Sequence, residues 1–441
     1  MLSLGLGIGT IGYARAEAPK RIDLPTLLDR ARRSPNARAA EEAAHAAHAK
    51  VDEVSLTWVP QFEVTAVGGP GPAITCRPSP QLCTSTDQGE AGLQFSGIFF
   101  RVDAKLAMPV YTFGKLSAGT QAAEAGARAA DALAQAAETD AAVDAARAFY
   151  AVKLARELIF MLDEGKGDLD DALTRVEKQL DKGKGDVTEA DRHRLRSFRA
   201  EIDARTSEAR KLEGTGLAGV RLFYGADDVD IDDKPLAESP GDLGTREKAR
   251  SLAEGSRPER RAAVAGVQAA DHLADVEARK WWPDFVLVGQ MTIARATGAD
   301  DPQNAFANDP FNVTSFSAGV ALRWMLDPGV RPSKVRGARA DAARARATAD
   351  FATQGVAAEA DKAWIEARDA KDRLTASRLG EKETRAWLVS ILQANEAGLG
   401  DPKDVAEALL AWFNMRARVL QALFDWDVGV VTLARATGQF K

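Results

Sequence analysis

Two histidines have the spacing that a metal site could use. His45 and His48 lie three residues apart in a stretch expected to be helical. No third ligand is evident, and at the equivalent positions of the repeat described below stand Gln268 and Asp271. We therefore expect an ordinary surface pair, no metal and no cofactor. The sequence also lacks a Gly-Lys-Ser/Thr loop, a Ser-His-Asp set and a Cys-His cluster, so it favours recognition and passage over catalysis.

The only two cysteines, Cys76 and Cys83, lie in one loop rich in proline and serine. A disulfide between them would suit an oxidising compartment. Two free thiols, or a metal pair that lacks further ligands, are the alternatives.

The N-terminus indicates export. An apolar run over residues 2–13 precedes Ala14-Arg15-Ala16, a small-x-small pattern that predicts a signal peptide over residues 1–16. The usual basic segment before the apolar run is missing, and a disordered tail is the alternative interpretation.

Charge disfavours a nucleic-acid role, and hydropathy excludes a transmembrane helix. The net charge of −6 over 441 residues gives no support for a nucleic-acid partner. After the N-terminus there is no apolar stretch of the roughly 18 residues that a transmembrane helix requires. If the chain crosses a membrane, it must do so as strands.

The two halves of the sequence repeat each other at a constant offset. Two pairs of motifs are 223 residues apart: Ser34-Pro35-Asn36 with Arg257-Pro258-Glu259, and Trp58-Val59-Pro60 with Trp281-Trp282-Pro283. Three further pairs are 215 residues apart: Phe113-Gly114 with Pro328-Gly329, Ala148-Phe149 with Ala363-Trp364, and Gly185-Asp186 with Gly400-Asp401. The expected organisation is a first repeat over 17–213, a linker over 214–244 and a second repeat over 245–441.

Each repeat is expected to contain one very long helix. Apolar residues recur at helical spacing over about 115–181, and about 333–396 is its counterpart. Such a helix would span on the order of 100 Å. Shorter helices are expected over about 24–57, 187–212, 245–280 and 402–436. A low-complexity stalk or an isolated coiled coil is the alternative, but neither accounts for the strands.

Four strands are expected, over about 60–68, 93–110, 283–294 and 314–326. Apolar residues alternate with polar ones in each, which is the pattern of an outer-membrane barrel. The residues expected to face lipid are Phe100, Val102, Leu106, Phe285, Leu287, Phe316, Val320, Leu322 and Trp324. Because a barrel needs about eight strands and open edges are not tolerated in lipid, several copies must share one barrel, and three would supply twelve strands.

In the order, duplication and spacing of its motifs, the chain resembles the TolC family of outer-membrane efflux and secretion channels over nearly its whole mature length. The resemblance is carried by the motif Arg257-Pro258-Glu259, by strand entries and exits, and by two glycine-containing helix reversals. These are Trp58-Val59-Pro60-Gln61-Phe62, Trp281-Trp282-Pro283-Asp284-Phe285, Ala107-Met108-Pro109-Val110-Tyr111, Leu322-Arg323-Trp324-Met325-Leu326, Lys182-Gly183-Lys184-Gly185-Asp186-Val187 and Ala397-Gly398-Leu399-Gly400-Asp401.

The resemblance implies an α+β membrane protein: a homotrimer with a twelve-stranded transmembrane β-barrel in outer-membrane lipid and a twelve-helix α-barrel in the periplasm. It also implies two partners, a periplasmic adaptor (membrane fusion protein) and an inner-membrane pump of the RND or ABC type. The chain would then be a passive exit duct for efflux or type I secretion, with drugs, metals or proteins as cargo. A periplasmic coiled-coil scaffold and an adaptor without a membrane barrel are the alternatives.

The two helix reversals, near 183–186 and 397–402, are the candidate adaptor-binding tips. They comprise Gly183, Gly185, Asp186, Val187, Gly398, Leu399, Gly400 and Asp401. Glycine supplies the backbone freedom that a turn needs, and Asp186 and Asp401 are expected to cap the returning helices. A purely structural role explains the glycines, whereas exposed loop tips on a rigid scaffold are also where partners dock.

The linker contains an acidic run over 227–233. We expect a solvated loop there, with calcium binding as a weaker alternative because the glycine and glutamate spacing of an EF-hand is missing.

Overall fold

The computed structural model describes residues 19–73, 95–182, 187–301, 309–396 and 402–440. The expected signal peptide, both cysteines and all the tip residues except Val187 lie outside these ranges. The chain forms two compact units. The first contains the chain up to Ala43 together with Ala130–Ala262 and Asp350–Lys441, and the second contains Ala44–Ala129 and Ala263–Ala349. Each unit therefore combines segments from both halves of the sequence.

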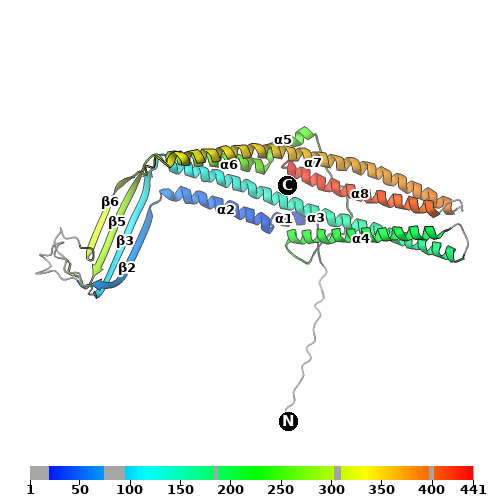
Figure 1. Cartoon of the computed structure of the whole chain (residues 1–441), viewed down its shortest axis with the longest axis horizontal. Coiled ribbons are helices and arrows are strands. Elements are labelled where there is room, and N and C mark those ends of the chain that lie inside the picture. The colour runs from blue at the N-terminus through cyan, green and yellow to red at the C-terminus, as the bar shows by residue number, and fades with distance from the viewer. Residues whose placement is uncertain (1–18, 74–94, 183–186, 302–308, 397–401, 441) are drawn as a thin grey trace, which may run out of the picture. The chain divides into compact units, whose positions relative to one another are not determined.

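The same kinds of element occur in the same order in the two halves (Figure 1). The first half contains β1 (Lys20–Ile22), α1 (Leu24–Ala31), α2 (Pro35–Ser55), the short 3-10 helix η1 (Leu56–Trp58), β2 (Gln61–Pro72), β3 (Phe95–Tyr111), α3 (Lys115–Lys182) and α4 (Glu189–Tyr224). After β4 (Val229–Ile231), the second half contains α5 (Arg246–Ser256), α6 (Pro258–Arg279), β5 (Asp284–Ala296), β6 (Val313–Arg323), α7 (Arg331–Glu396) and α8 (Pro402–Ala436).

The long helices α3 and α7 run for 68 and 66 residues and begin and end close to the expected positions. Neither is interrupted, since no proline occurs within α3 and the only proline of α7 is its second residue, where a missing N–H costs nothing. None of the helices in the described ranges is long and apolar enough to span a membrane.

Proline divides each of the two shorter helices that were expected to be continuous. The stretch expected over 24–57 is split before Pro35, and the stretch expected over 245–280 is split before Pro258. Proline fits the first position of a helix but forces the residue before it into an extended conformation, as at Arg257 (φ −63°, ψ 127°). The chain therefore stops one helix and starts the next at each of these points.

The motif around Pro258 also positions a buried cation. The Arg257 side chain is almost fully buried and binds Glu259 and Glu359, each at 2.8 Å. Arg435 of α8 reaches the same two glutamates at 3.0 Å. Paired charges make the burial of Arg257 tolerable, so this motif ties α5, α6, α7 and α8 together.

The helix α4 continues past the expected start of the linker at 214 and ends at Tyr224. The glycines in this stretch do not break the helix, and two of them, Gly216 and Gly219, serve close packing. A Cβ atom at Gly216 would lie 2.7 Å from Cγ2 of Val152 in α3, and one at Gly219 would lie 2.9 Å from Cβ of Ala148. The linker begins only after Gly225, which adopts the left-handed conformation (φ 83°) that ends the helix.

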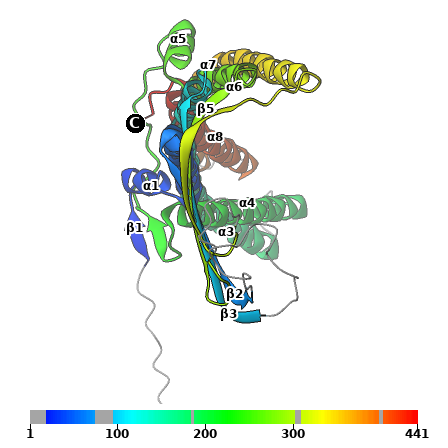
Figure 2. The same cartoon turned by 90° about the vertical axis from the view of Figure 1, so that its left-hand side faces the viewer.

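The expectation of a solvated acidic loop was wrong for its central residues. Val229 and Ile231 are buried in the core of the first unit, and β4 pairs in parallel with β1 (Figure 2). The intervening carboxylates bind basic side chains: Asp230 binds Arg156 at 2.6 Å, Asp232 binds Lys153, and Asp233 binds Arg21. Alternation of apolar and acidic residues thus produced a short buried strand.

A hydrogen-bonded group fastens the linker to the helices. The Ser239 amide donates to Oδ1 of Asp427 at 2.7 Å, and Nε1 of Trp426 donates to the Ser239 carbonyl at 3.0 Å. The Tyr150 hydroxyl lies 3.1 Å from the Ser239 hydroxyl. Asp427 is fully buried, and its Oδ2 atom has no hydrogen-bond partner in the described ranges. Burial, reinforced by the negative charge of Glu238, raises the pKa of Asp427 to about 6.

Candidate membrane-facing sheet and helix ends

Four strands form one antiparallel sheet in the order β2-β3-β5-β6, so that both halves of the sequence meet where β3 pairs with β5 (Figure 1). The register pairs Phe62 with Leu106, Leu106 with Gly289 and Gly289 with Ala318. Directly opposed residues project from the same face of a sheet. Each apolar set is therefore aligned with the apolar set of the next strand.

One face of the sheet is apolar and exposed. It carries eight of the residues expected to face lipid: Phe100, Val102, Leu106, Phe285, Leu287, Phe316, Val320 and Leu322. Phe62 and Phe316, on its two outer strands, are 74% and 77% exposed. A contiguous apolar surface of this kind marks a place where a protein meets another apolar phase.

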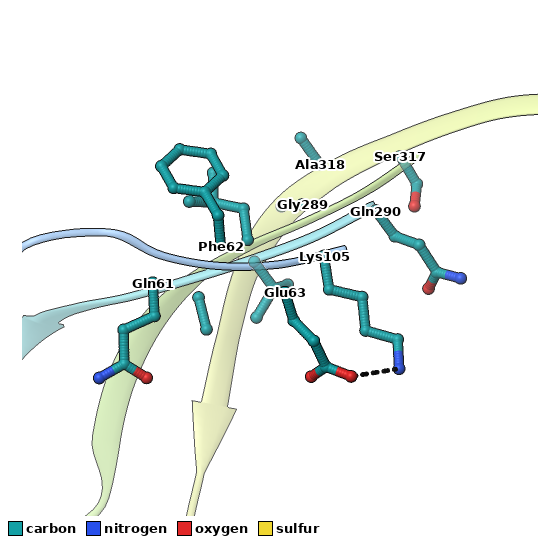
Figure 3. Close-up of a pocket in the computed structure, with 12 residues that line it drawn as sticks. Gln61, Phe62, Glu63, Lys105, Gly289, Gln290, Ser317 and Ala318 are labelled. Carbon is teal, nitrogen blue, oxygen red and sulfur yellow. Dashed lines mark ion pairs between the residues drawn. The ribbon is translucent and has the colours of Figure 1, made fainter. Parts of the chain in front are cut away.

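The opposite face carries the charged and polar side chains of the strands, together with some apolar ones such as Val286 and Val288. Figure 3 shows Gln61, Glu63, Lys105 and Gln290 projecting to one side of the sheet and Phe62 to the other. Lys105 lies 4.0 Å from Glu63 on the neighbouring strand. Farther along, Asp103 accepts hydrogen bonds from Arg101 at 2.6 Å and from Thr292 at 2.8 Å.

Lys105–Glu63 and Asp103–Thr292 join neighbouring strands, and Arg101–Asp103 lies within β3; paired charges of this kind suit a face in contact with water.

Aromatic side chains gather where the strands meet the helices. The Phe113 ring stacks on Trp282 at 5.5 Å and on Phe285 at 6.3 Å, and packs edge-on against Tyr111 at 4.7 Å. Aromatic rings with a polar atom are enriched at both boundaries of transmembrane barrels. The cluster at the ends of the strands therefore resembles the aromatic girdle that marks a membrane boundary of such barrels.

The turn from β3 into α3 is held at several points. Phe113 and Gly114 have positive φ angles of 51° and 77°, and the Gly114 carbonyl accepts a hydrogen bond from Arg279 at 2.8 Å. Nζ of Lys115 binds both the Trp282 carbonyl and Asp284 at 2.7 Å. The Phe113-Gly114 motif of the repeat thus fixes the direction in which the long helix leaves the sheet.

The expectation that Trp324 is a strand residue was wrong. β6 ends at Arg323, and the Trp324 indole N–H donates to the Trp281 carbonyl at 3.0 Å. The indole N–H is thereby satisfied by a backbone acceptor just before the start of β5.

The sheet has two unpaired edges within the described ranges. β2 pairs only with β3, and β6 pairs only with β5. Three successive antiparallel pairings make β6 run opposite to β2. The β6 edge of one copy is therefore oriented for antiparallel pairing with the β2 edge of another.

Of the eight candidate tip residues, only Val187 is described. Its side chain is half-buried and packs with Leu169, Val176 and Leu195 of α3 and α4. The expected cap at Asp186 was wrong: Thr188 caps α4, because its hydroxyl accepts from the Asp191 amide and the Asp191 carboxylate accepts from the Thr188 amide. Gly183, Gly185, Asp186, Gly398, Leu399, Gly400 and Asp401 lie outside the described ranges, as do Cys76 and Cys83.

No metal-binding group is formed within the described part of the chain. There, no three or more His, Cys, Asp or Glu side chains converge as metal ligands would. His45 and His48 both make interactions within the protein.

Two features were missed by reasoning from the sequence. The aromatic cluster at the helix junction could have been found, because Trp282 and Phe113 both lie in motifs that mark the repeat. Asp427 was less visible. Its only signal is that an acidic residue falls within the apolar row Leu423, Trp426 and Val430 of α8.

A family model described as outer membrane efflux protein matches residues 27–213 and 249–439, in both halves of the sequence. No curated protein sequence matches the chain at a significant level.

Several solved structures share the fold. The outer-membrane channel OprN is 18% identical, with 98% of each chain covered and a TM-score of 0.75. The CmeC outer membrane channel of Campylobacter jejuni is 14% identical, with 100% of this chain and 95% of that chain covered and a TM-score of 0.77. The outer membrane protein VceC of Vibrio cholerae is 15% identical, with 95% and 97% covered and a TM-score of 0.77. At these identities the likeness establishes the fold.

Proposed function

The chain belongs to the outer membrane efflux protein family, and on that premise we propose that three copies form a passive exit duct through the outer membrane. The observation that carries this proposal is the sheet, which has one exposed apolar face, one polar face and two open edges of opposite direction. Lipid covers the apolar face, and the polar face lines a water-filled passage.

Closure of the barrel requires more than one copy. Four strands enclose no interior, and an unpaired strand edge in the hydrocarbon region would leave backbone groups without hydrogen bonds. Three copies supply twelve strands, and the opposite directions of β2 and β6 allow every seam to be antiparallel. The helices of the same three copies continue the passage into the periplasm.

Partners provide the energy and the opening signal. The chain contains no nucleotide-binding loop, so transport must be driven by an inner-membrane pump, coupled through a periplasmic adaptor. The family description favours efflux over type I secretion. We place adaptor docking at the two expected helix reversals, around Gly185 and Gly400, because loop tips on a rigid scaffold are where partners commonly dock.

Substitutions at the tips and in the sheet separate docking from assembly. Gly185→Trp or Gly400→Trp should abolish export while the amount of trimer in the outer membrane stays normal, because a distant turn contributes little to closing the barrel. Phe100→Asp should have the opposite effect. It places a charge toward lipid at a cost of about 2 kcal/mol and lowers the amount of trimer assembled.

The measurement is export per assembled trimer, and Gly255→Trp is the control. Gly255 is an exposed glycine of α5 with open space around it, and its substitution should change neither quantity. Normal export in both tip variants would overturn adaptor docking at these turns. Loss of trimer in those variants as severe as in Phe100→Asp would mean that the turns are structural.

A further inference from the structure

The start of α7 carries three basic side chains without a counter-charge. Lys334, Arg336 and Arg339 are exposed, and within the described ranges none of them forms an ion pair. Other basic residues nearby differ: Arg331 is buried beside Glu277, and Arg346 binds Asp271. We call Lys334, Arg336 and Arg339 the basic patch.

One cation of the patch, Lys334, lies where it opposes the stability of its own helix. The N-terminal turns of a helix carry a partial positive charge, so acidic residues are favoured there and basic residues are unfavourable. The first turn of α7 contains no acidic residue. Lys334 lies in this first turn, so its positive charge does not serve helix formation and needs another reason.

The fold itself does not require the patch, as the internal repeat shows. At the offset of 215 residues, the counterparts of Lys334, Arg336 and Arg339 are Gly119, Gln121 and Glu124 in α3. The same element in the same position of the repeat therefore has no cation at any of the three sites. The patch is a property of the second half alone.

The patch follows directly from the apolar face of the sheet. Between β6 and α7 the chain exposes Trp324, Met325, Leu326 and Val330, with Met325 73% exposed. The three cations come within the next three turns of helix, roughly 12 Å along its axis from Arg331 to Arg339. An apolar surface, then an exposed aromatic residue, then long basic side chains is the order found across a bilayer boundary.

We propose that the basic patch binds the phosphate headgroups of anionic lipids in the leaflet next to the helices. This inference rests on the proposed position of the sheet in the outer membrane. Anionic headgroups supply the negative charge that the chain does not, and the guanidinium groups of Arg336 and Arg339 can form paired hydrogen bonds with phosphate. The patch would thereby fix the depth at which the second half of each copy sits.

The test compares two pairs of substitutions on the same helix. Arg336→Gln/Arg339→Gln removes two cations of the patch and keeps good helix formers. Lys382→Gln/Arg385→Gln is the matched control, because it removes two exposed cations with the same spacing and with no ion pair in the described ranges. Binding of phosphatidylglycerol and of phosphatidylcholine to each purified full-length protein is measured by native mass spectrometry in a neutral detergent.

The patch variant should bind phosphatidylglycerol roughly tenfold more weakly than the unmodified protein, whereas the control should bind it normally. Phosphatidylcholine binding should be the same in all three proteins. Equal phosphatidylglycerol binding by the patch variant and the control would overturn the proposal.

Two further outcomes distinguish failure of the lipid proposal from failure of the proposed membrane function. If the patch variant keeps its lipid binding but changes the ratio of anion to cation permeability in planar bilayers, the patch lines the passage and the lipid proposal is wrong. If the unmodified protein does not enter phosphatidylcholine bilayers at all, the proposed membrane function fails, and this inference fails with it.

Discussion

Burial of a carboxyl group makes Asp427 sensitive to pH. Its pKa lies near 6, above the ordinary value of 3.8. The folded protein therefore holds the proton more tightly than the unfolded chain, and stability falls as the pH rises from about 4 to about 6. Above that range the charged form costs roughly 3 kcal/mol per chain. Glu238 of the linker, whose negative charge adds to the rise in the pKa of Asp427, itself binds Arg378 at 2.6 Å and Lys371 of α7. Tyr150 of α3 contacts the hydroxyl of Ser239, the residue whose amide donates to Asp427.

Asp427→Asn should flatten this pH dependence. The amide keeps an oxygen that can accept from the Ser239 amide, but it carries no charge. The wild-type protein should melt at a lower temperature at about pH 7.5 than at about pH 5, and the variant should show a smaller difference. Thermal unfolding of the helices, followed by circular dichroism, gives the melting temperatures of both proteins at both pH values. Asp425→Asn, which removes the neighbouring carboxylate that binds Arg373, should keep the wild-type difference. Identical pH profiles for Asp427→Asn and the wild type would show that Asp427 does not cause the pH dependence.

The two cysteines should form a disulfide in protein isolated from outer membranes. The loop closed between Cys76 and Cys83 is short, so the bond should contribute roughly 2–3 kcal/mol in the chain-entropy model and affect loop shape more than assembly. Alkylation followed by mass spectrometry counts the free thiols, and two modified cysteines without prior reduction would refute the prediction. Replacement of both by serine should leave export unchanged.

At the scale of elements, periodicity predicted much of the structure. The long helices and the four strands begin and end near the expected residues, because an exposed apolar face imposes strict alternation and a helix of this length imposes a sustained helical period. Pro35 and Pro258 mark the repeat in the sequence, and each also ends one helix and begins the next. The pairing of β3 with β5 depends on contacts far apart in the sequence, which a local pattern does not contain.

The glycines of α4 show why one boundary was misplaced. Glycine ends a helix when the backbone needs a positive φ, as at Gly225, but it also lets two helices approach closely, as at Gly216. The residue type is the same in both cases, and only the packing against α3 and the backbone angles distinguish the two roles. Likewise, the burial of Asp427 depends on how the linker returns to α8.

Substitution of neighbouring glycines in α4 tests this interpretation. Gly216→Ala should destabilise the protein by about 1–3 kcal/mol, because the new methyl group would meet Val152 at 2.7 Å. Gly214→Ala should instead stabilise it by roughly 0.5–1 kcal/mol, because that site is exposed and open and alanine favours a helix. Thermal melting of both variants shows whether each substitution raises or lowers the stability. A gain in stability at Gly216 would show that the close approach of α3 and α4 does not exist in solution.

At the scale of the whole molecule, the open edges of the sheet determine the assembly. Detergent extraction should yield a trimer, because β2 and β6 can be paired only by other copies. Chemical cross-linking followed by mass measurement should give three chains as the largest abundant species. A stable monomer would refute the shared barrel.

Each copy contributes both a β2 edge and a β6 edge, and this has a genetic consequence. In the proposed trimer, one copy with a damaged edge leaves a seam open however sound the other two are. A cell that makes normal and edge-defective chains in equal amounts, and assembles them at random, would build only about one ring in eight entirely from normal chains. Mutations that damage β2 or β6 should therefore be dominant. Cells that carry the defective allele should become sensitive to the exported compounds even when they also carry an intact copy of the gene.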